Sequence, residues 1–190
     1  LLLAPLLAVI ALWVRRDSPG PVIYRQERVG RYGQLFRIYK FRTMRVGADA
    51  AGPQITVGAD ARITRAGQFL RRTKLDELPQ FANVLCGDMS VVGPRPEVPK
   101  YVALYPTEVA AQVLSVRPGI TDLASLAYRD ESEVLARSSD PERAYVQEIL
   151  PAKLQYACQY VRERSLWLDL RIISRTAAAV FSAPADPQKP

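Results

Sequence analysis

The chain has 190 residues, of which 48% are hydrophobic and 24% are charged, so it is long enough for a domain with an appendage and too apolar for a disordered protein. Its formal net charge of +7 favours an anionic partner: nucleic acid, anionic lipid or a phosphorylated substrate. The chain has no histidine, and its only cysteines are Cys86 and Cys158, which excludes histidine as a general base and any metal site of cysteine and histidine.

The first segment, residues 1–14, has no charged side chain and is followed by Arg15 and Arg16. A transmembrane helix needs about 20 apolar residues, so this length favours a re-entrant segment, a truncated span or a buried helix. Arginines after the apolar run indicate that this end faces the cytoplasm, and Pro5 would kink a helix. We therefore predict a re-entrant membrane helix over residues 1–18 whose first part is missing from this numbering. An ordinary buried helix remains the alternative.

Two β-prone stretches follow, residues 22–26 and 35–41, and the glycine-bearing link between them predicts a β-hairpin with a longer loop. Basic residues far outnumber acidic ones across residues 1–45, which suits a position on anionic lipid headgroups. A solvated basic surface is the alternative. Residues 47–60 are small, polar and glycine-containing, and they predict a mobile loop.

The remainder of the chain is predicted to be mostly helical. Helical spacing and proline-led starts predict helices over residues 63–75, 77–85, 96–105, 107–116, 141–164 (interrupted near Pro151) and 166–181. The last of these is amphipathic, with Trp167 and Leu170 on one face, and the residues after Ser182 are expected to be disordered. The predicted fold class is α+β, mainly helical, with one β-hairpin and amphipathic helices that lie on a surface.

Two adjacent carboxylates, Asp76 and Glu77, are the strongest candidates for chemistry. Neighbouring residues on a helix do not share a face, so the two are expected to have different roles. The alternative is helix capping, because the stretch from Thr73 to Asp76 fits a capping box and Asp76 could also be the N-cap of the next helix.

Cationic residues around this pair favour a phosphate site. Arg71 and Arg72 lie one turn away, Lys40 and Arg42 close the hairpin, and Arg95 is braced between two prolines. Such cations are expected to keep a carboxylate ionised at neutral pH and to attract phosphate. For Arg95 the alternative is a turn residue paired with a nearby acid. A metal here would be a hard ion held by oxygens, so Mg²⁺ or Mn²⁺.

A nucleic-acid site is an alternative to the phosphate site, because the chain is basic. Arginines interleaved with Tyr24, Tyr32 and Tyr39 could form a stacking platform for bases. The apolar first segment argues against this interpretation, since a nucleic-acid binder gains nothing from it.

Six short motifs, in this order, resemble those of the bacterial sugar transferase family, the monotopic phosphoglycosyl transferases that start glycoconjugate assembly. They are Lys40-Phe41-Arg42-Thr43-Met44, Leu75-Asp76-Glu77-Leu78-Pro79-Gln80, Asn83-Val84-Leu85, Gly87-Asp88-Met89-Ser90, Val92-Gly93-Pro94-Arg95-Pro96-Glu97 and Arg117-Pro118-Gly119-Ile120-Thr121. The resemblance extends from the apolar first segment to Asp169.

The resemblance implies a reaction. A sugar 1-phosphate would pass from a nucleoside diphosphate sugar, expected to be a UDP-sugar, to undecaprenyl phosphate, with release of the nucleoside monophosphate. The family requires Mg²⁺ and works by a ping-pong mechanism through a phosphosugar on an aspartate. By motif match Asp76 is that nucleophile and Glu77 is the second acid of the pair; both are candidate metal ligands.

The resemblance also implies roles for other residues. Lys40, Arg71 and Arg95 match basic positions of the family site, so they are expected to bind substrate phosphates together with Arg72. Asp169 matches an acid near the C-terminal helix. Many members continue the sixth motif with Gly-Trp-Ala-Gln where this chain has residues 122–125, Asp-Leu-Ala-Ser, so no sugar specificity is transferred.

The implied setting is the cytoplasmic face of a bacterial inner membrane, where a monotopic helix bent at Pro5 would hold the enzyme against membrane lipids. The resulting division is a re-entrant helix over residues 1–18, a catalytic domain over 19–182 and a disordered tail over 183–190. Membrane lipids are expected partners, nucleic acid is not, and a homodimer is allowed. The expected pathway is the start of exopolysaccharide, lipopolysaccharide or other glycoconjugate synthesis. The runner-up is a non-enzymatic basic module that binds membrane surfaces.

Overall fold

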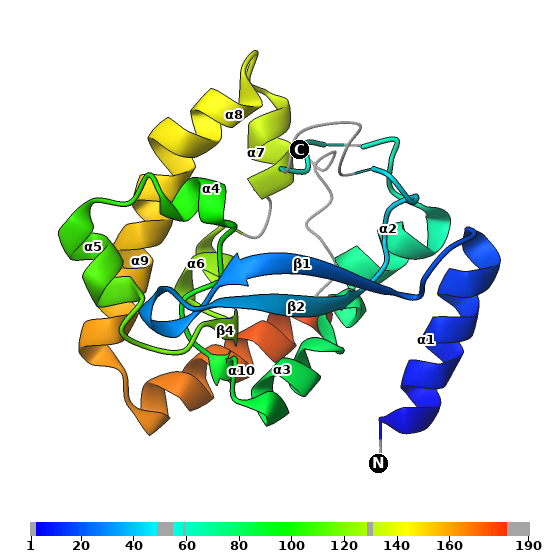
Figure 1. The fold of residues 1–190 in the computed structure, drawn as a ribbon, viewed down its shortest axis with the longest axis horizontal. Coiled ribbons are helices and arrows are strands. Elements are labelled where there is room, and N and C mark those ends of the chain that lie inside the picture. Colours follow the sequence, from blue (N-terminus) through cyan, green and yellow to red (C-terminus); the bar gives the residue numbers. More distant parts are fainter. Residues whose placement is uncertain (1–2, 49–54, 59, 129–130, 182–190) are drawn as a thin grey trace.

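A β-hairpin runs between a helical group on one side of the molecule and helices α1 and α2 on the other (Figure 1). The computed structural model describes residues 3–48, 55–58, 60–128 and 131–181. Strand β1 (Ile23–Val29) pairs antiparallel with β2 (Leu35–Phe41), and a 3₁₀ turn, η1 (Arg31–Gly33), joins them. The predicted hairpin is confirmed.

Helix α1 (Ala4–Asp17) corresponds to the predicted apolar first segment. Its Ile10 and Val14 are buried in a small core with Phe41 of β2. Pro5 lies in the first turn of α1, where its missing N–H removes no helical hydrogen bond. The part of α1 that the structure describes therefore has no kink at Pro5, and the re-entrant arrangement stays a prediction. No helix among the described residues is long and apolar enough to cross a membrane.

Arg42 fixes the end of α1 to the hairpin. Its guanidinium donates hydrogen bonds to the backbone carbonyl of Pro21 at 2.5 Å and to that of Ser18 at 2.6 Å. The residue is only 4% exposed. These carbonyl groups take most of the hydrogen bonds of its guanidinium, and the prediction that Arg42 adds to the cations of a phosphate site stays untested.

Three short elements follow the segment after the hairpin: α2 (Arg65–Arg72), the 3₁₀ turn η2 (Leu75–Glu77) and α3 (Gln80–Cys86). The Thr64 side chain caps α2 by accepting a hydrogen bond from the backbone N–H of Gly67 at 3.0 Å. The helices predicted over residues 63–75 and 77–85 are confirmed. Both are shorter than predicted, because the 3₁₀ turn η2 lies between them.

A parallel strand pair, β3 (Ser90–Val92) with β4 (Gly119–Thr121), was missed in the sequence. Gly119 of β4 and Gly93, the residue after β3, lie very close together. A Cβ atom on Gly119 would lie 2.1 Å from the backbone nitrogen of Gly93. Only glycine fits such an approach. This contact holds the turn at residues 93–97, which contains Arg95, against β4.

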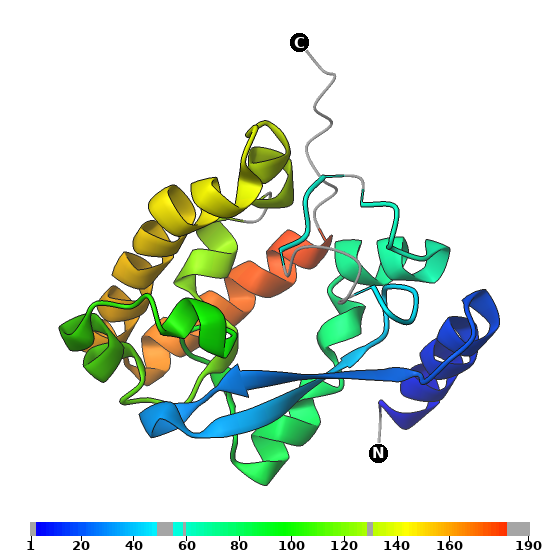
Figure 2. The same ribbon diagram turned by 45° about the horizontal axis from the view of Figure 1, so that its top comes forward.

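The helical group carries the larger core. Its elements are α4 (Pro99–Val102), α5 (Thr107–Val113), α6 (Leu123–Ala127), α7 (Glu131–Ala136), α8 (Pro141–Ala144), the π-helical turn η3 (Tyr145–Ile149), α9 (Leu150–Glu163) and α10 (Leu166–Phe181). The predicted interruption near Pro151 is confirmed, since η3 immediately precedes α9. Helices α6 and α7 were not predicted. Figure 2 shows α10 running from the α9 side toward α2.

Two predictions fall partly or wholly outside the described residues. The predicted loop over residues 47–60 includes 49–54 and 59, and the predicted tail after Ser182 is outside entirely. At the described ends of the loop, Ala48 and Ile55 are buried, and Ile55 belongs to the larger core. The loop is therefore attached to the protein on both sides of its undescribed part.

We expect Gly119→Ala to lower the free energy of unfolding by about 2–3 kcal/mol, because the added methyl group would push β4 away from Gly93. Urea unfolding followed by circular dichroism measures this. The matched control is Gly30→Ala, whose Cβ would first meet the ring of Phe36 at 3.1 Å, so a loss under about 1 kcal/mol is expected. Equal losses in the two variants would contradict the close-approach argument.

Candidate active site

Asp76 and Glu77 lie in the 3₁₀ turn η2, and both side chains turn into the protein. Lys74, just before them, adopts a left-handed backbone conformation with φ of 57°, which reverses the chain after α2. Asp76 is 6% exposed and Glu77 is 8% exposed. Neither η2 nor α3 has a side-chain cap, so the capping alternative for this pair is wrong.

Glu77 is held by two cations. Its Oε1 accepts hydrogen bonds from Lys40 Nζ and from Arg95 Nη2, each at 2.7 Å. Burial alone would raise the pKa of Glu77, but the charges of Arg95 and Lys40 outweigh burial and hold the pKa well below its usual range. Glu77 is therefore an ionised anchor that fixes two cations around one oxygen.

Asp76 is in a different environment. Its Oδ1 is buried and has no hydrogen-bond partner. Burial, and secondly the negative charge of Glu77, raise the pKa of Asp76, while Lys40, Lys74 and Arg71 offset this only in part. The pKa values of the two carboxylates therefore shift in opposite directions, and the expectation that surrounding cations favour the ionised form is confirmed for Glu77. The result is one anchored carboxylate beside one unpaired carboxylate.

Arg71 and Arg95 reach the site from opposite sides. Arg71 donates from Nε to the hydroxyl of Thr43 at 2.8 Å and from Nη1 to the hydroxyl of Thr56 at 2.9 Å. Helix α2 can bring Arg71 this close to Thr43 because Gly67 has no Cβ, which would lie 2.1 Å from the Thr43 carbonyl oxygen. Arg95 pairs with a nearby acid, Glu77, as its alternative predicted, but it also lines the cavity described below, so its role as a phosphate ligand stays a prediction.

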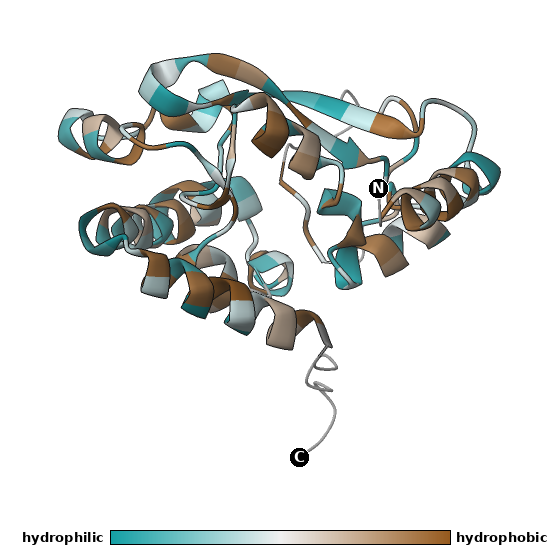
Figure 3. Ribbon diagram, turned by 90° about the horizontal axis from the view of Figure 1, so that it is seen from below, coloured by the Kyte–Doolittle hydropathy of each residue, from teal (hydrophilic) through white to brown (hydrophobic). Residues whose placement is uncertain are grey.

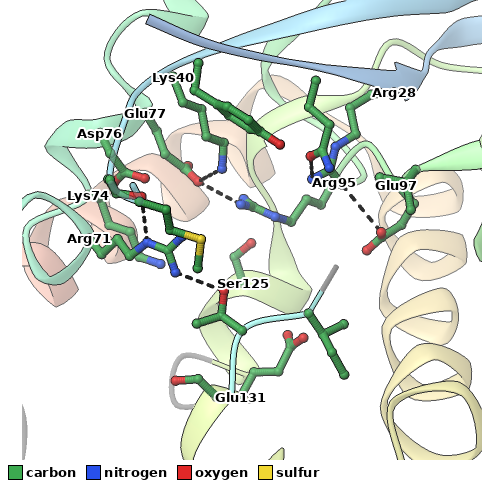
Figure 4. Close-up of a pocket in the computed structure, with 18 of the residues that line it drawn as sticks. Arg28, Lys40, Arg71, Lys74, Asp76, Glu77, Arg95, Glu97, Ser125 and Glu131 are labelled. Carbon is green, nitrogen blue, oxygen red and sulfur yellow. Dashed lines mark hydrogen bonds and ion pairs between the residues drawn. The ribbon is translucent and has the colours of Figure 1, made fainter. Parts of the chain in front are cut away.

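These residues line one end of a cavity of about 950 Å³ (Figure 4). Lys40, Arg71, Asp76, Glu77 and Arg95 are all among its lining residues, so the structure brings five predicted site residues together. A cavity of this size suits a ligand as large as a nucleotide sugar.

Two other predicted residues are placed less centrally. Arg72 also borders the cavity, but its side chain is exposed and lies over the Phe69 ring at 5.8 Å from the ring centroid. Asp169 lies on α10, accepts a hydrogen bond from the Tyr160 hydroxyl at 2.9 Å and is not part of the cavity lining. The structure therefore gives Asp169 a packing role and no contact with the candidate site.

A second charged group in the cavity wall was not singled out in the sequence. Glu97 accepts a hydrogen bond from the Tyr145 hydroxyl at 2.7 Å and lies 3.6 Å from Arg28 Nη1. Arg28 Nη1 also donates to the carbonyl of Pro96 at 3.0 Å, so these contacts brace the turn that contains Arg95. The period-two alternation of β1 could have found Arg28, because Tyr24 of the same strand lies directly opposite Lys40.

The carboxylate pair also fits a divalent metal. The described residues contain no cluster of three or more histidine, cysteine or acidic side chains. Mg²⁺, however, often binds proteins through one or two carboxylates and takes its other ligands from substrate phosphates and water. The unpaired buried Oδ1 of Asp76, next to Glu77, is suited to such an ion.

Comparison with known proteins agrees with this geometry. The family model described as bacterial sugar transferase matches residues 1–183. The chain is 40% identical over 184 residues to the UDP-glucose:undecaprenyl-phosphate glucose-1-phosphate transferase of Escherichia coli (strain K12), a match that covers 95% of this chain and 37% of that protein. It is 37% identical over 183 residues to the UDP-N-acetylgalactosamine-undecaprenyl-phosphate N-acetylgalactosaminephosphotransferase of Aeromonas hydrophila, covering 95% of this chain and 40% of that protein.

A shorter relative matches over most of its length. The exopolysaccharide production protein PSS of Rhizobium leguminosarum bv. phaseoli is 40% identical over 185 residues, which cover 94% of this chain and 87% of that protein. The chain thus spans about two fifths of the length of the first two relatives and most of this one.

The two carboxylates should respond oppositely to neutralisation. We expect Glu77→Gln to lower the free energy of unfolding at pH 7 by about 2 kcal/mol, because Lys40 and Arg95 lose their shared anion. This expected loss of stability is smaller than for a fully buried ion pair, because the Arg95 side chain is 33% exposed. We expect Asp76→Asn to raise the free energy of unfolding by about 1 kcal/mol, because it removes an unpaired buried charge. Denaturant unfolding measures both changes.

The pH dependence of these effects follows from the pKa directions. The contribution of Glu77, whose pKa is lowered, is fully present above its unfolded value of about 4.3 and is lost as the pH falls through the folded pKa. The gain from Asp76→Asn should be complete only above the raised pKa of Asp76 and should vanish below the unfolded value of about 3.9. Changes of the same sign in both variants at pH 7 would refute the assignment of one anchored and one unpaired carboxylate.

Proposed function

The chain belongs to the bacterial sugar transferase family, and on that basis we propose that it transfers a sugar 1-phosphate from a UDP-sugar to undecaprenyl phosphate and releases UMP. The observation that supports this most directly is the unpaired, buried Oδ1 of Asp76 beside three cations that line the same cavity. The transfer would start exopolysaccharide or other glycoconjugate synthesis, in keeping with the names of the relatives.

The two carboxylates would divide the work. Glu77 is unsuited to nucleophilic attack, because two cations hold its Oε1 and its lowered pKa makes it a weak nucleophile. Asp76 has a free oxygen, and a carboxylate with a raised pKa is the stronger nucleophile once it is ionised. We therefore assign the covalent step to Asp76 and the organisation of Lys40 and Arg95 to Glu77.

In the first half-reaction Asp76 Oδ1 attacks the phosphorus that carries the sugar. A bond forms between the carboxylate oxygen and that phosphorus, and the bond from the phosphorus to the leaving UMP breaks in line. Lys40, Arg71 and Arg95 would neutralise the charge of the two phosphates. Mg²⁺, held by Asp76, Glu77 and phosphate oxygens, would supply further charge neutralisation when bound.

In the second half-reaction the phosphate of undecaprenyl phosphate attacks the same phosphorus and releases the Asp76 carboxylate. The attacking group is already an anion at neutral pH, so no side chain has to remove a proton from it. A chain without histidine can therefore perform both steps.

Exposed apolar side chains support a position at the membrane surface. They occur on α1, α3 and α10, whose ribbons all have hydrophobic (brown) segments in the view from below (Figure 3). Leu85 of α3 is 89% exposed, and Leu166 and Trp167 at the start of α10 are 73% and 81% exposed. We propose that this face lies in the cytoplasmic leaflet of the inner membrane, where the lipid substrate is found.

We expect the protein with Mg²⁺, a UDP-sugar and undecaprenyl phosphate to release UMP, and Asp76→Asn to lose about 10³-fold or more of the rate. With a UDP-sugar alone, mass spectrometry should find a phosphosugar adduct on Asp76. The matched control is Asp169→Asn, an aspartate outside the cavity, which should keep the rate within about threefold. Turnover that requires both substrates bound together, without an adduct, would contradict the ping-pong mechanism. Liposome binding without turnover would support the membrane-surface module instead.

We expect Trp167→Glu to weaken binding to anionic liposomes by about tenfold, because burial of such a side chain stabilises by about 1.5–3 kcal/mol. Liposome flotation measures this. Val134→Glu is the matched control: Val134 is also exposed, at 52%, but lies on α7, away from α3 and α10 (Figure 1). Equal weakening by both changes would argue against the proposed membrane face.

A further inference from the structure

The end of the cavity away from the carboxylate pair has an ion pair of its own. Glu131, the first residue of α7, lies with its Oε2 at 2.5 Å from the Nζ of Lys153 on α9. Both residues line the cavity, together with Ser125 and Tyr128 at α6. Figure 4 shows Glu131 across the cavity from Lys40, with Ser125 between them.

Stability alone is a weak reason for this ion pair. The side chains of Lys153 and Glu131 are only 15% and 26% exposed, so both have lost much of their hydration. The attraction between the charges of a buried ion pair often only repays that desolvation. A carboxylate and an ammonium that face a cavity, however, keep acceptor and donor positions beyond the one bond they share. Those positions are available to a ligand.

On the basis of the function proposed above, we propose that this end of the cavity binds the hydroxyl groups of the donor sugar and that Glu131 and Lys153 determine which sugar is accepted. Sugar hydroxyls can donate to Glu131 and accept from Lys153 at the same time. A phosphate would be repelled by the carboxylate, and the cations at the other end already serve that group. The two ends thus match the two chemically different parts of a sugar phosphate.

A nucleobase fits this end poorly. Bases commonly stack on an open aromatic face, but Tyr145 and Tyr101 are only 2% and 3% exposed. Their ring centroids lie 4.8 Å apart, and the ammonium of Lys153 lies 5.0 Å from the centroid of Tyr145. The ring of Tyr128 packs edge-on against Tyr156 at 6.3 Å. The aromatic rings therefore support the ion pair and each other, and the charged groups remain for the ligand.

Backbone hydrogen bonds link the turn that contains Arg95 to helix α6. The buried carboxylate of Asp122 accepts one hydrogen bond from the backbone N–H of Arg95, at 3.3 Å, and another from that of Ser125, at 2.7 Å. It thus ties the turn that contains the phosphate-binding Arg95 to the start of α6. This is also where residues 122–125 depart from the sequence that many family members share.

Calorimetric binding separates the sugar from the nucleotide. The probes are UDP, UDP-glucose, UDP-galactose and UDP-N-acetylgalactosamine, titrated into the full chain without Mg²⁺, so that binding is measured without the transfer step. We expect at least one UDP-sugar to bind more tightly than UDP. Glu131→Gln should reduce that advantage by about tenfold and leave the affinity for UDP within about twofold. Lys153→Gln should act in the same way, and it keeps the test valid if one variant does not fold.

The matched control is Glu142→Gln, which removes the carboxylate of an exposed ion pair between Glu142 and Lys100. Neither of these two residues lines the cavity. It should change none of the affinities. Thermal unfolding of each variant establishes that it is folded. If both cavity variants keep the full advantage of the UDP-sugar, or if UDP loses affinity to the same extent, the assignment to the sugar is wrong.

UMP release by the wild-type protein reports separately on the proposed function. Sugar-dependent binding that the variants abolish, in a protein that releases no UMP, would refute the reaction and support the sugar site. Normal UMP release with an unchanged ranking of the three donors in both variants would support the reaction and refute the sugar site.

Discussion

The organisation of the site depends on one oxygen atom, Oε1 of Glu77, to which Lys40 and Arg95 both donate at 2.7 Å. The three residues come from β2, from η2 and from the turn that follows β3, so this contact joins segments that are far apart in the sequence. Two like charges cannot approach each other in a buried site unless an anion lies between them. Glu77 supplies that anion and leaves both cations beside Asp76.

The surrounding contacts hold this arrangement in place. Asn83 of α3, which is fully buried, donates to the carbonyl of Arg37 at 2.9 Å and accepts from the N–H of Tyr39 at 3.1 Å, so α3 is fixed to the strand that carries Lys40. On the other side, Gly93 and Gly119 pack backbone against backbone and fix the turn with Arg95. Among the described residues, Asp76 Oδ1 is the only buried side-chain oxygen without a hydrogen-bond partner, while three buried nitrogens, Arg28 Nε, Arg42 Nε and Gln80 Nε2, also have none. The oxygen of Asp76 is the one of these four atoms that can act as a nucleophile.

The sequence predicted the elements whose signal is local. The alternation of residues 35–41, the spacing of the last helix and the break before Pro151 each depend on neighbouring residues, and each is confirmed. The parallel pair of β3 and β4 was missed because each strand has three residues, too few for a periodic pattern, and their pairing bridges a long loop. The short helices α6 and α7 were missed for a similar reason, since five and six residues are too few to show a face.

The same distinction applies to the site. Motifs identified Asp76, Glu77, Lys40, Arg71 and Arg95, and the structure gathers all five at one end of the cavity. Sequence spacing could not show which carboxylate the cations hold, because the answer depends on the register of β2 against η2 and on the turn around Arg95. Sequence spacing also gave no reason to separate Asp169 from these five residues. Only the structure shows that helix α10 places Asp169 beside Tyr160.

The charge balance of the site is compatible with the proposed reaction, in which one site would accept two phosphorylated substrates in turn. Glu77 is a single anion shared by two cations, so the pair of cations keeps a net positive charge after Glu77 is satisfied, and Arg71 adds another. In the proposed reaction a donor diphosphate would meet this charge first. When the nucleotide left, its negative charge would leave with it, and the site would again attract the phosphate of a lipid. A histidine base would add nothing to either proposed step, because both attacking groups would be anions that the cations draw into place.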